Sequence, residues 1–469
     1  MKKIISLLVL LTVLYSCGLV TKKYDAPKLS SEQESNLYRD YQSNDTNTIA
    51  TVEWRSFFAD PQLVALIQKG IDNNYDLRNA LLQMGVAENH LRQAKLGFLP
   101  TLNFAPQVTF NKQSKNSVNL PSNVNINLQT TNVSLGFTSA WEVEIWGKLS
   151  AAKRGAQAGV FQTEATKRAV QTNLIASIAN AYYTLLSLDK QLEITEQTIG
   201  LREKTVVALN ALLGAGNVNG ADVVQAEANL SAAKVTVPDL KRAIREMENY
   251  LCILTAQHLQ AIERGRLDAA LTNTALVAGV PAQLLANRPD VMVAEANFRQ
   301  AFEAQNVAKA SMFPTLTLTA GSAGISALTT KTLFDPLSIF ANLVGGLTQP
   351  IFQRGQLKAN HRNSIVAKEQ AFNQFQNTLL ISGQEVTDAL YAYKMINEKQ
   401  KERAIQIEAL NKAVNFRMEL LKYSSTTNYT DVLSSEQVLL SAELAGVNDQ
   451  LQAQQSLIEL YRALGGGWR

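Results

Sequence analysis

Residues that could carry catalysis or bind a metal are few and widely separated in this sequence. The three histidines, His90, His258 and His361, never stand in the HxxxH or HExxH spacing that brings two ligands onto one helix face. Glu142 and Glu144 lie two apart in a predicted strand and would share one face, but nothing near them suggests acid–base chemistry. The sequence therefore predicts no enzyme, no metal site and no cofactor.

One residue near the N-terminus is a candidate for covalent modification. A basic start, Met1-Lys2-Lys3, precedes an apolar run of 12 residues, which is too short to cross a bilayer as a helix. The run ends in Leu14-Tyr15-Ser16-Cys17, which looks like a bacterial lipobox. We expect residues 1–16 to be a signal peptide and Cys17 to be lipidated; an ordinary secretory signal is the alternative. Cys252 is then left as a packing residue without a disulfide partner.

Composition excludes several classes of protein. The chain of 469 residues is 46% hydrophobic and 18% charged, with a net charge of +4, so it is neither disordered nor a nucleic-acid-binding protein. Two cysteines exclude a disulfide scaffold. A mean hydropathy of −0.07 excludes a bundle of membrane helices, but it is compatible with a membrane β-barrel, whose strands alternate between apolar and polar residues.

The chain repeats itself once. Residues 94–102 recur as 308–316, and Asp222-Val223 recurs as Asp431-Val432, each about 200 residues later. We therefore predict an N-terminal segment over 17–59 and a first structural repeat over 60–255. A connecting segment over 256–282 and a second repeat over 283–469 would follow.

Each repeat holds two predicted strands after a helix that should stop at a proline, Pro100 or Pro314. Apolar residues alternate with polar ones, so each strand has one apolar face. A soluble sheet would pack that face on helices, but the helices here are committed to one another. Four strands are too few to close a membrane barrel, so several chains would have to share one. The strands are expected near 101–111, 131–145, 314–326 and 335–349.

Long helical hairpins follow the strands, over 148–255 and 353–464. A helix from 148 to 213 would extend about 100 Å. Its apolar seam has heptad spacing, broken only at Thr195 and Arg202, and the return helix keeps the phase through Pro238, which we interpret as a kink rather than an end. The fold class is therefore mainly α with a small β part.

Four segments carry a resemblance to a known family. They are Leu284-Leu285-Ala286-Asn287-Arg288-Pro289-Asp290-Val291, Trp141 to Lys148, Trp54 to Leu63, and Tyr461 to Trp468. Together they resemble the TolC-like outer-membrane efflux protein family, in the lipoprotein branch that serves resistance-nodulation-division pumps. The similarity covers nearly the whole mature chain, and Glu142 and Glu144 stand where the family often has aspartate or other residues.

This resemblance implies a homotrimer with a twelve-stranded β-barrel in the outer membrane, four strands from each chain, continuous with a trimeric α-barrel in the periplasm. Outer-membrane lipid, a periplasmic membrane-fusion adaptor protein and an inner-membrane efflux pump would be its partners. The helix–helix turns 214–221 and 423–430 would then be the periplasmic tips. The tip and aperture residues are Gly214, Gly216, Gly220, Asp222, Tyr423, Tyr429 and Asp431.

The sequence allows two roles for each of the aspartates and tyrosines at the predicted tips. Asp222 and Asp431 are placed as helix N-caps, or they form acidic rings that favour cations. Tyr423 and Tyr429 either constrict the opening or pack the turn. The implied function is a passive exit duct for small molecules such as drugs. The alternatives are a conduit for a type I protein secretion machine and a lipid-anchored spacer that conducts nothing.

Overall fold

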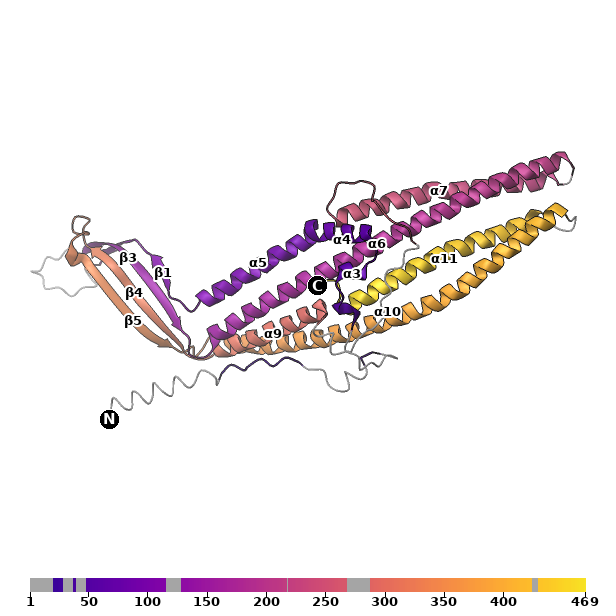
Figure 1. Ribbon diagram of the computed structural model, residues 1–469. Helices are drawn as coiled ribbons and strands as arrows, with labels where there is room; N and C mark the ends of the chain where they lie inside the picture. Colours follow the sequence, from indigo (N-terminus) through magenta and orange to yellow (C-terminus); the bar gives the residue numbers. More distant parts are fainter. Residues whose placement is uncertain are drawn as a thin grey trace, which may run out of the picture. The chain divides into compact units, whose positions relative to one another are not determined.

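The computed structural model describes most of the chain from residue 20 onward (Figure 1). Cys17 and most of the predicted connecting segment lie outside the described residues. The chain divides into two compact units. The described ranges are 20–27, 37–38, 48–114, 128–216, 218–267, 287–423 and 429–469.

The first unit, residues 1–27, 84–163 and 294–375, contains an antiparallel sheet in the order β1-β3-β4-β5, with β2 also paired to β3. Five strands replace the four predicted, because Pro106, which has no N–H to donate, separates β1 from β2. Both pair with β3 in one unchanged register, so together they occupy one strand position. The strands are β1 (Thr101–Phe104), β2 (Gln107–Lys112), β3 (Gln129–Val143), β4 (Thr315–Ala327) and β5 (Ile339–Thr348).

A bulge in β4 keeps one face of the sheet apolar. The register of β4 shifts against β3 between Thr138 and Ser139, and against β5 between Ala320 and Ala323. An inserted residue reverses which face later side chains occupy. Leu318 and Ile325, which simple alternation would place on opposite faces, therefore share a face.

Helices make up most of the described chain, as predicted. Helix α6 (Lys148–Gly214) and α10 (Gln356–Tyr423) are the long ones, and α7 (Gly220–Leu254) and α11 (Tyr429–Ala463) return alongside them. Helix α7 continues through Pro238, so the prediction that this proline does not end the helix is confirmed. The shorter elements are η2 (Ile49–Thr51), α3 (Trp54–Phe57), α4 (Pro61–Asn73), α5 (Tyr75–Leu96), α9 (Pro289–Ala310) and η5 (Pro336–Ser338).

The main core lies in the second unit, residues 28–83, 164–293 and 376–469. Helix α6 contributes the fully buried Tyr182 and Leu185, and Phe57 of α3 stacks on Tyr461 of α11 with ring centroids 4.1 Å apart. The core thus joins segments from both predicted repeats. Among the described helices, none combines the length and apolarity needed to cross a membrane.

Candidate functional site

The sheet has two chemically different faces. Because opposite residues of paired strands point to the same side, Leu102 and Phe104 of the first strand position, Trp141 of β3 and Leu343 of β5 all lie on one face. These side chains are exposed, Leu102 by 71% and Leu343 by 75%. So large an exposed apolar surface marks contact with lipid or another protein. The same face also carries Val108, Phe110, Phe137, Leu316, Leu318, Ile325, Ile339 and Leu347.

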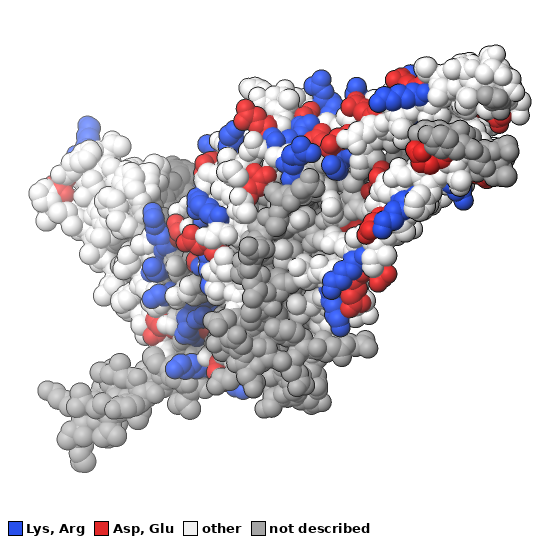
Figure 2. Space-filling model, turned by 45° about the vertical axis from the view of Figure 1, so that its right-hand side comes forward, with Lys and Arg blue, Asp and Glu red and all other residues white. Residues whose placement is uncertain are grey.

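The opposite face is mainly hydroxyl, amide and glycine. It includes Asn103, Thr109, Thr138 and Thr317. Few charges lie over the strands (Figure 2). Within the described strands, the charged residues are Lys112 and Glu142, each within two residues of its strand's end. An uncharged polar wall behind an apolar one suits a strand that faces water on one side and lipid on the other.

The two edges of this sheet are β5 and the position shared by β1 and β2. An edge strand presents a row of backbone N–H and C=O groups that seek partners, and in a membrane such groups must be paired within protein. Among the described strands, β5 and the position shared by β1 and β2 thus each have one side without a strand partner.

Junctions between helix and strand are held by tryptophans and glutamates. The Trp146 indole donates to the carbonyl of Pro314 over 2.6 Å, and the Trp141 indole donates to the carbonyl of Phe98 over 2.8 Å. Glu142 pairs with Lys148 at 2.9 Å, and Glu144 accepts from the Leu149 N–H at 2.7 Å. Both glutamates are thus junction contacts rather than an acid–base pair. Pro100 and Pro314 lie directly before β1 and β4.

The first helix–helix turn is a capping box. Asn219 is the N-cap of α7 and accepts from the Asp222 N–H at 3.0 Å, while the Asp222 carboxylate accepts from the Asn219 N–H at 3.2 Å. The expectation that Asp222 is the N-cap is therefore wrong, because the helix begins at Gly220: Asn219 is the N-cap and Asp222 is the third helical residue, which completes the capping box. Gly214 ends α6, Gly216 has a φ of +75°, which favours glycine, and Gly220 opens α7.

The start of α11, which follows the second turn, packs against the first hairpin, while residues 424–428 of that turn lie outside the described residues. Asp431 is the third residue of α11, so it is not its N-cap either. Tyr429 is 3% exposed and packs with Leu209 and Val223 of the first hairpin. Tyr429 therefore packs the tips together within one chain. Tyr423 is the last residue of α10, and the structure does not describe its side chain.

Comparison with known proteins decides the family. The family model for outer membrane efflux proteins matches residues 66–257 and 280–466. The chain belongs to the outer membrane efflux protein family. It is 28% identical to the toluene efflux pump outer membrane protein TtgC of Pseudomonas putida, over 100% of this chain and 96% of that one.

Further relatives agree with this assignment. The probable outer membrane lipoprotein SilC of Salmonella typhimurium is 24% identical, over 97% of each chain. The open state of the MtrE outer membrane channel of Neisseria gonorrhoeae has the same fold, with a TM-score of 0.84, 24% identity and coverage of 96% of this chain and 98% of that one. The mainly helical fold with a small sheet is thus the fold of this family of channel proteins. Across the described ranges, no group of three or more His, Cys, Asp or Glu side chains is arranged to hold a metal ion.

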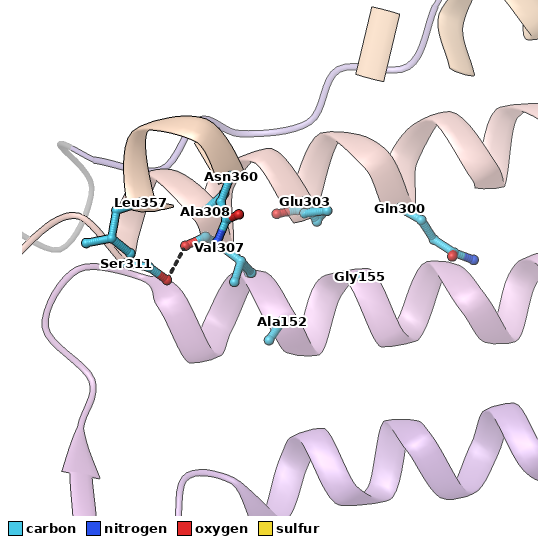
Figure 3. A pocket seen from close by; sticks show the side chains of 11 residues that line it. Ala152, Gly155, Gln300, Glu303, Val307, Ala308, Ser311, Leu357 and Asn360 are labelled. Carbon is cyan, nitrogen blue, oxygen red and sulfur yellow. Dashed lines mark hydrogen bonds between the residues drawn. The ribbon is translucent and has the colours of Figure 1, made fainter. Parts of the chain in front are cut away.

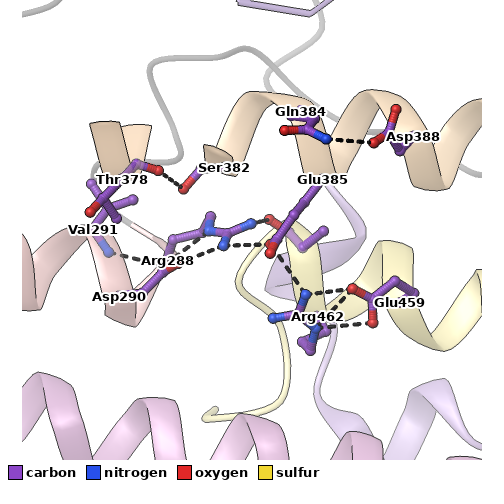
Figure 4. A network of polar contacts seen from close by, with 11 residues as sticks. Arg288, Asp290, Val291, Thr378, Ser382, Gln384, Glu385, Asp388, Glu459 and Arg462 are labelled. Carbon is purple, nitrogen blue, oxygen red and sulfur yellow. Dashed lines mark hydrogen bonds and ion pairs between the residues drawn. The ribbon is translucent and has the colours of Figure 1, made fainter. Parts of the chain in front are cut away.

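Arg288 and Asp290, which lie in a segment that resembles the efflux family, belong to an ion-pair network in the second unit (Figure 4). Arg288, only 3% exposed, pairs with Asp290 at 2.6 Å and with Glu385 at 2.7 Å, and it donates to the carbonyl of Ala463 at 2.7 Å. Arg462 extends the network to Glu459 and Glu385. Arg288 therefore ties the start of α9 to α10 and to the last carbonyls of α11.

The N-terminal residues 20–27 bind along α9 as an extended strap in the first unit (Figure 1). The Asn306 side chain accepts from the Lys22 N–H at 3.0 Å and donates to the Lys22 carbonyl at 2.9 Å. The Tyr24 ring packs on Phe302, and its hydroxyl donates to Glu295 at 3.0 Å. Sequence reasoning missed this strap, because its partners lie more than 270 residues away along the chain.

Asn306→Ala is expected to release the strap. The substitution removes both bonds to the Lys22 backbone, which should cost about 1–3 kcal/mol of local stability. Tryptic cleavage after Lys22 and Lys23 should accelerate about tenfold in the purified full chain. Asn360→Ala, at an exposed asparagine of the same unit, is the matched control. Equal cleavage rates for both variants would show that Asn306 does not hold the strap.

A groove of about 480 Å³ runs between α6 and α9 beside the first turn of α10 (Figure 3). Ala152, Gly155 and Ala308 line it, and Gln300 and Ser311 border it. Its acidic residue, the fully buried Glu303, is paired with Arg154 at 2.7 Å and accepts from Asn306 at 3.0 Å. With that carboxylate already paired, the groove is a site of small-residue packing rather than of chemistry.

Proposed function

We propose that three copies of this chain close one β-barrel and form the outer-membrane exit duct of a tripartite efflux system. The outer-membrane and efflux assignment follows from the family. One observation carries the trimer: the sheet has an apolar face, a polar face and two edges that need strands from another chain. Three such sheets give twelve strand positions, enough to close a barrel.

The strap supports lipidation at Cys17. A Cβ added to Gly147, between β3 and α6, would lie 2.7 Å from the Thr21 hydroxyl, so Thr21 is held at the end of the sheet. Cys17 lies four positions before Thr21 in the sequence, with three residues between them, which allows a reach of at most about 14 Å. An acyl chain on Cys17 would therefore enter the bilayer beside the strands whose apolar face lies in it.

The tips of the two helical hairpins are the proposed docking surface for a periplasmic adaptor and, through it, an inner-membrane pump. The cargo is proposed to be small molecules, and the pump would select it. TtgC is named for toluene efflux and CusC of Escherichia coli for cation efflux, yet both match this chain at similar identity, 28% and 25%. That similarity supports a duct whose own wall discriminates little between cargoes.

The proposal is tested with the purified full-length protein and a deletion strain. Detergent-extracted protein should have the mass of three chains and should conduct ions in planar bilayers. Deletion should increase sensitivity to dyes, detergents or antibiotics, which a role in protein secretion would leave unchanged. A stably inserted protein that never conducts would favour the spacer and overturn the duct.

A further inference from the structure

A buried polar cluster lies between the two hairpins, below their tips. Its centre is Arg202 of α6, which is 4% exposed and stands where the heptad seam is broken. Its guanidinium donates to the carbonyl of Asn229 in α7 at 2.7 Å and to the side chain of Gln437 in α11 at 2.9 Å. One side chain therefore connects both helices of the first hairpin to the second hairpin.

Glu436, next to Gln437, is buried beside this arginine without hydrogen bonds. It is 5% exposed, and neither of its carboxylate oxygens has a hydrogen-bond partner among the described residues. The Nε of Arg202 and the side-chain nitrogen of Asn229 are also buried and unpartnered in the described structure. In this packing a negative charge on Glu436 would be desolvated without a direct bond to offset it.

The surroundings of Glu436 favour its neutral form. Burial raises the pKa of Glu436, and the positive charge of Arg202 opposes that rise only in part. Tyr429, which lies in the same helix as Glu436, is a second titratable group that interacts with it. Burial together with the Glu436 charge raises the pKa of Tyr429 to about 12. Helix α7 contributes the uncharged Asn229 to this packing. On α10, the charged Arg417 donates to the carbonyl of Asp431 at 2.6 Å, five residues before Glu436 in α11.

We propose that Glu436 and Arg202 form a proton-dependent latch that holds the second hairpin against the first near the tips. The latch rests on the proposed function, because the packing of the hairpins sets the width of the duct's periplasmic end. Arg202 positions the two hairpins, and the proton on Glu436 decides whether the buried packing is stable. Separating the hairpins lets water reach the carboxylate.

The sign follows from linkage. A carboxyl whose pKa is higher in the packed state than in water binds its proton more tightly when packed. Its contribution to packing is therefore complete below the ordinary glutamate value of about 4.3 and is lost as the pH rises through the higher, packed-state value. Acid should close the periplasmic end, and neutral pH should loosen it.

The test compares the wild-type protein with Glu436→Gln, which keeps the shape and removes the titration. Conductance of wild-type protein in planar bilayers should rise several-fold between about pH 4.5 and about pH 7.5, whereas E436Q should stay at the low, acid value. The matched control is Glu203→Gln, because Glu203 is adjacent to Arg202 but 51% exposed and paired with Lys234. E203Q should keep the wild-type pH profile.

A second measurement tests the latch independently of whether the protein conducts. Amide hydrogen exchange of residues 429–440, corrected for its intrinsic pH dependence, should be faster near neutral pH in wild-type protein but not in E436Q. If no variant conducts, the proposed duct is overturned, and the exchange data alone decide the latch. A pH profile that is flat in wild-type protein, or unchanged in E436Q, overturns the latch.

Discussion

Gly324→Val is expected to prevent the central strands from pairing and to abolish assembly of the membrane part. Gly324 of β4 lies opposite Gly136 of β3. A Cβ at Gly324 would stand 2.2 Å from the Leu135 carbonyl oxygen and 2.5 Å from the Gly136 Cα. Both contacts are with backbone, so no change of rotamer relieves them. The two strands would have to separate locally. We expect this to cost more stability than the roughly 1–3 kcal/mol that an extra methylene usually costs in a well-packed core.

Phe340 explains why glycines are tolerated here. It pairs with Gly324 on the other side of β4, and a Cβ at Gly136 would lie 3.6 Å from the tip of its ring. The aromatic ring thus covers two residues that have no side chains, a known way to stabilise glycines in sheets. A valine at 324 would also displace this ring.

The measurement is the amount of G324V protein extracted from the outer membrane, together with its Tm. We expect at least a tenfold lower yield, roughly the effect of 1.4 kcal/mol. Gly346→Val is the matched control: it lies on the same face of the sheet, and a Cβ there meets nothing within 4 Å. Because valine favours strands, G346V should be neutral or slightly stabilising. Equal yields for the two variants would contradict the steric argument.

Period-2 and heptad patterns indicate a mainly helical chain with a few strands, because local sequence largely determines both kinds of element. Local patterns could not predict the bulge in β4. Leu318 and Ile325 fit one apolar face only if a residue is inserted between them, and several small residues there offer no preference for its place. The interruption between β1 and β2 does have a local signal, Pro106.

The tips show a similar limit. The glycines at 214, 216 and 220 indicate the turn. Choosing Asn219 rather than Asp222 as the N-cap depends on the exact residue at which the helix begins, and a local pattern defines that boundary only to within one or two residues. The buried cluster did leave a signal. Arg202 is the one charged residue that interrupts the apolar seam of α6 as the heptad spacing defines it, and a charged residue at such a position must find buried partners. Those partners, Asn229 and Gln437, come from two other helices and are not readable from one sequence.

Arg288→Met is expected to destabilise the second unit by about 3–5 kcal/mol. Methionine fills a similar volume, so the loss is electrostatic. Glu385 would keep only Arg462, at 3.2 Å, and the Ala463 carbonyl at the end of α11 would lose its donor. The Tm of the helical circular-dichroism signal should fall by on the order of 10 °C. Lys412→Met, which breaks an exposed pair with Glu408, should change Tm by about 1 °C or less.

The pH dependence separates this electrostatic loss from a packing defect. Burial alone would raise the pKa of Asp290, but the hydrogen bond and charge of Arg288 outweigh it and hold that pKa below its usual value. A lowered carboxyl pKa contributes stability above its ordinary value of about 3.9 and loses it as the pH falls toward the folded-state value. Wild-type protein should therefore lose more stability in acid than R288M. The difference in Tm between the two proteins should narrow as the pH falls. A difference that stays constant down to about pH 3 would mean that Arg288 acts through packing rather than charge.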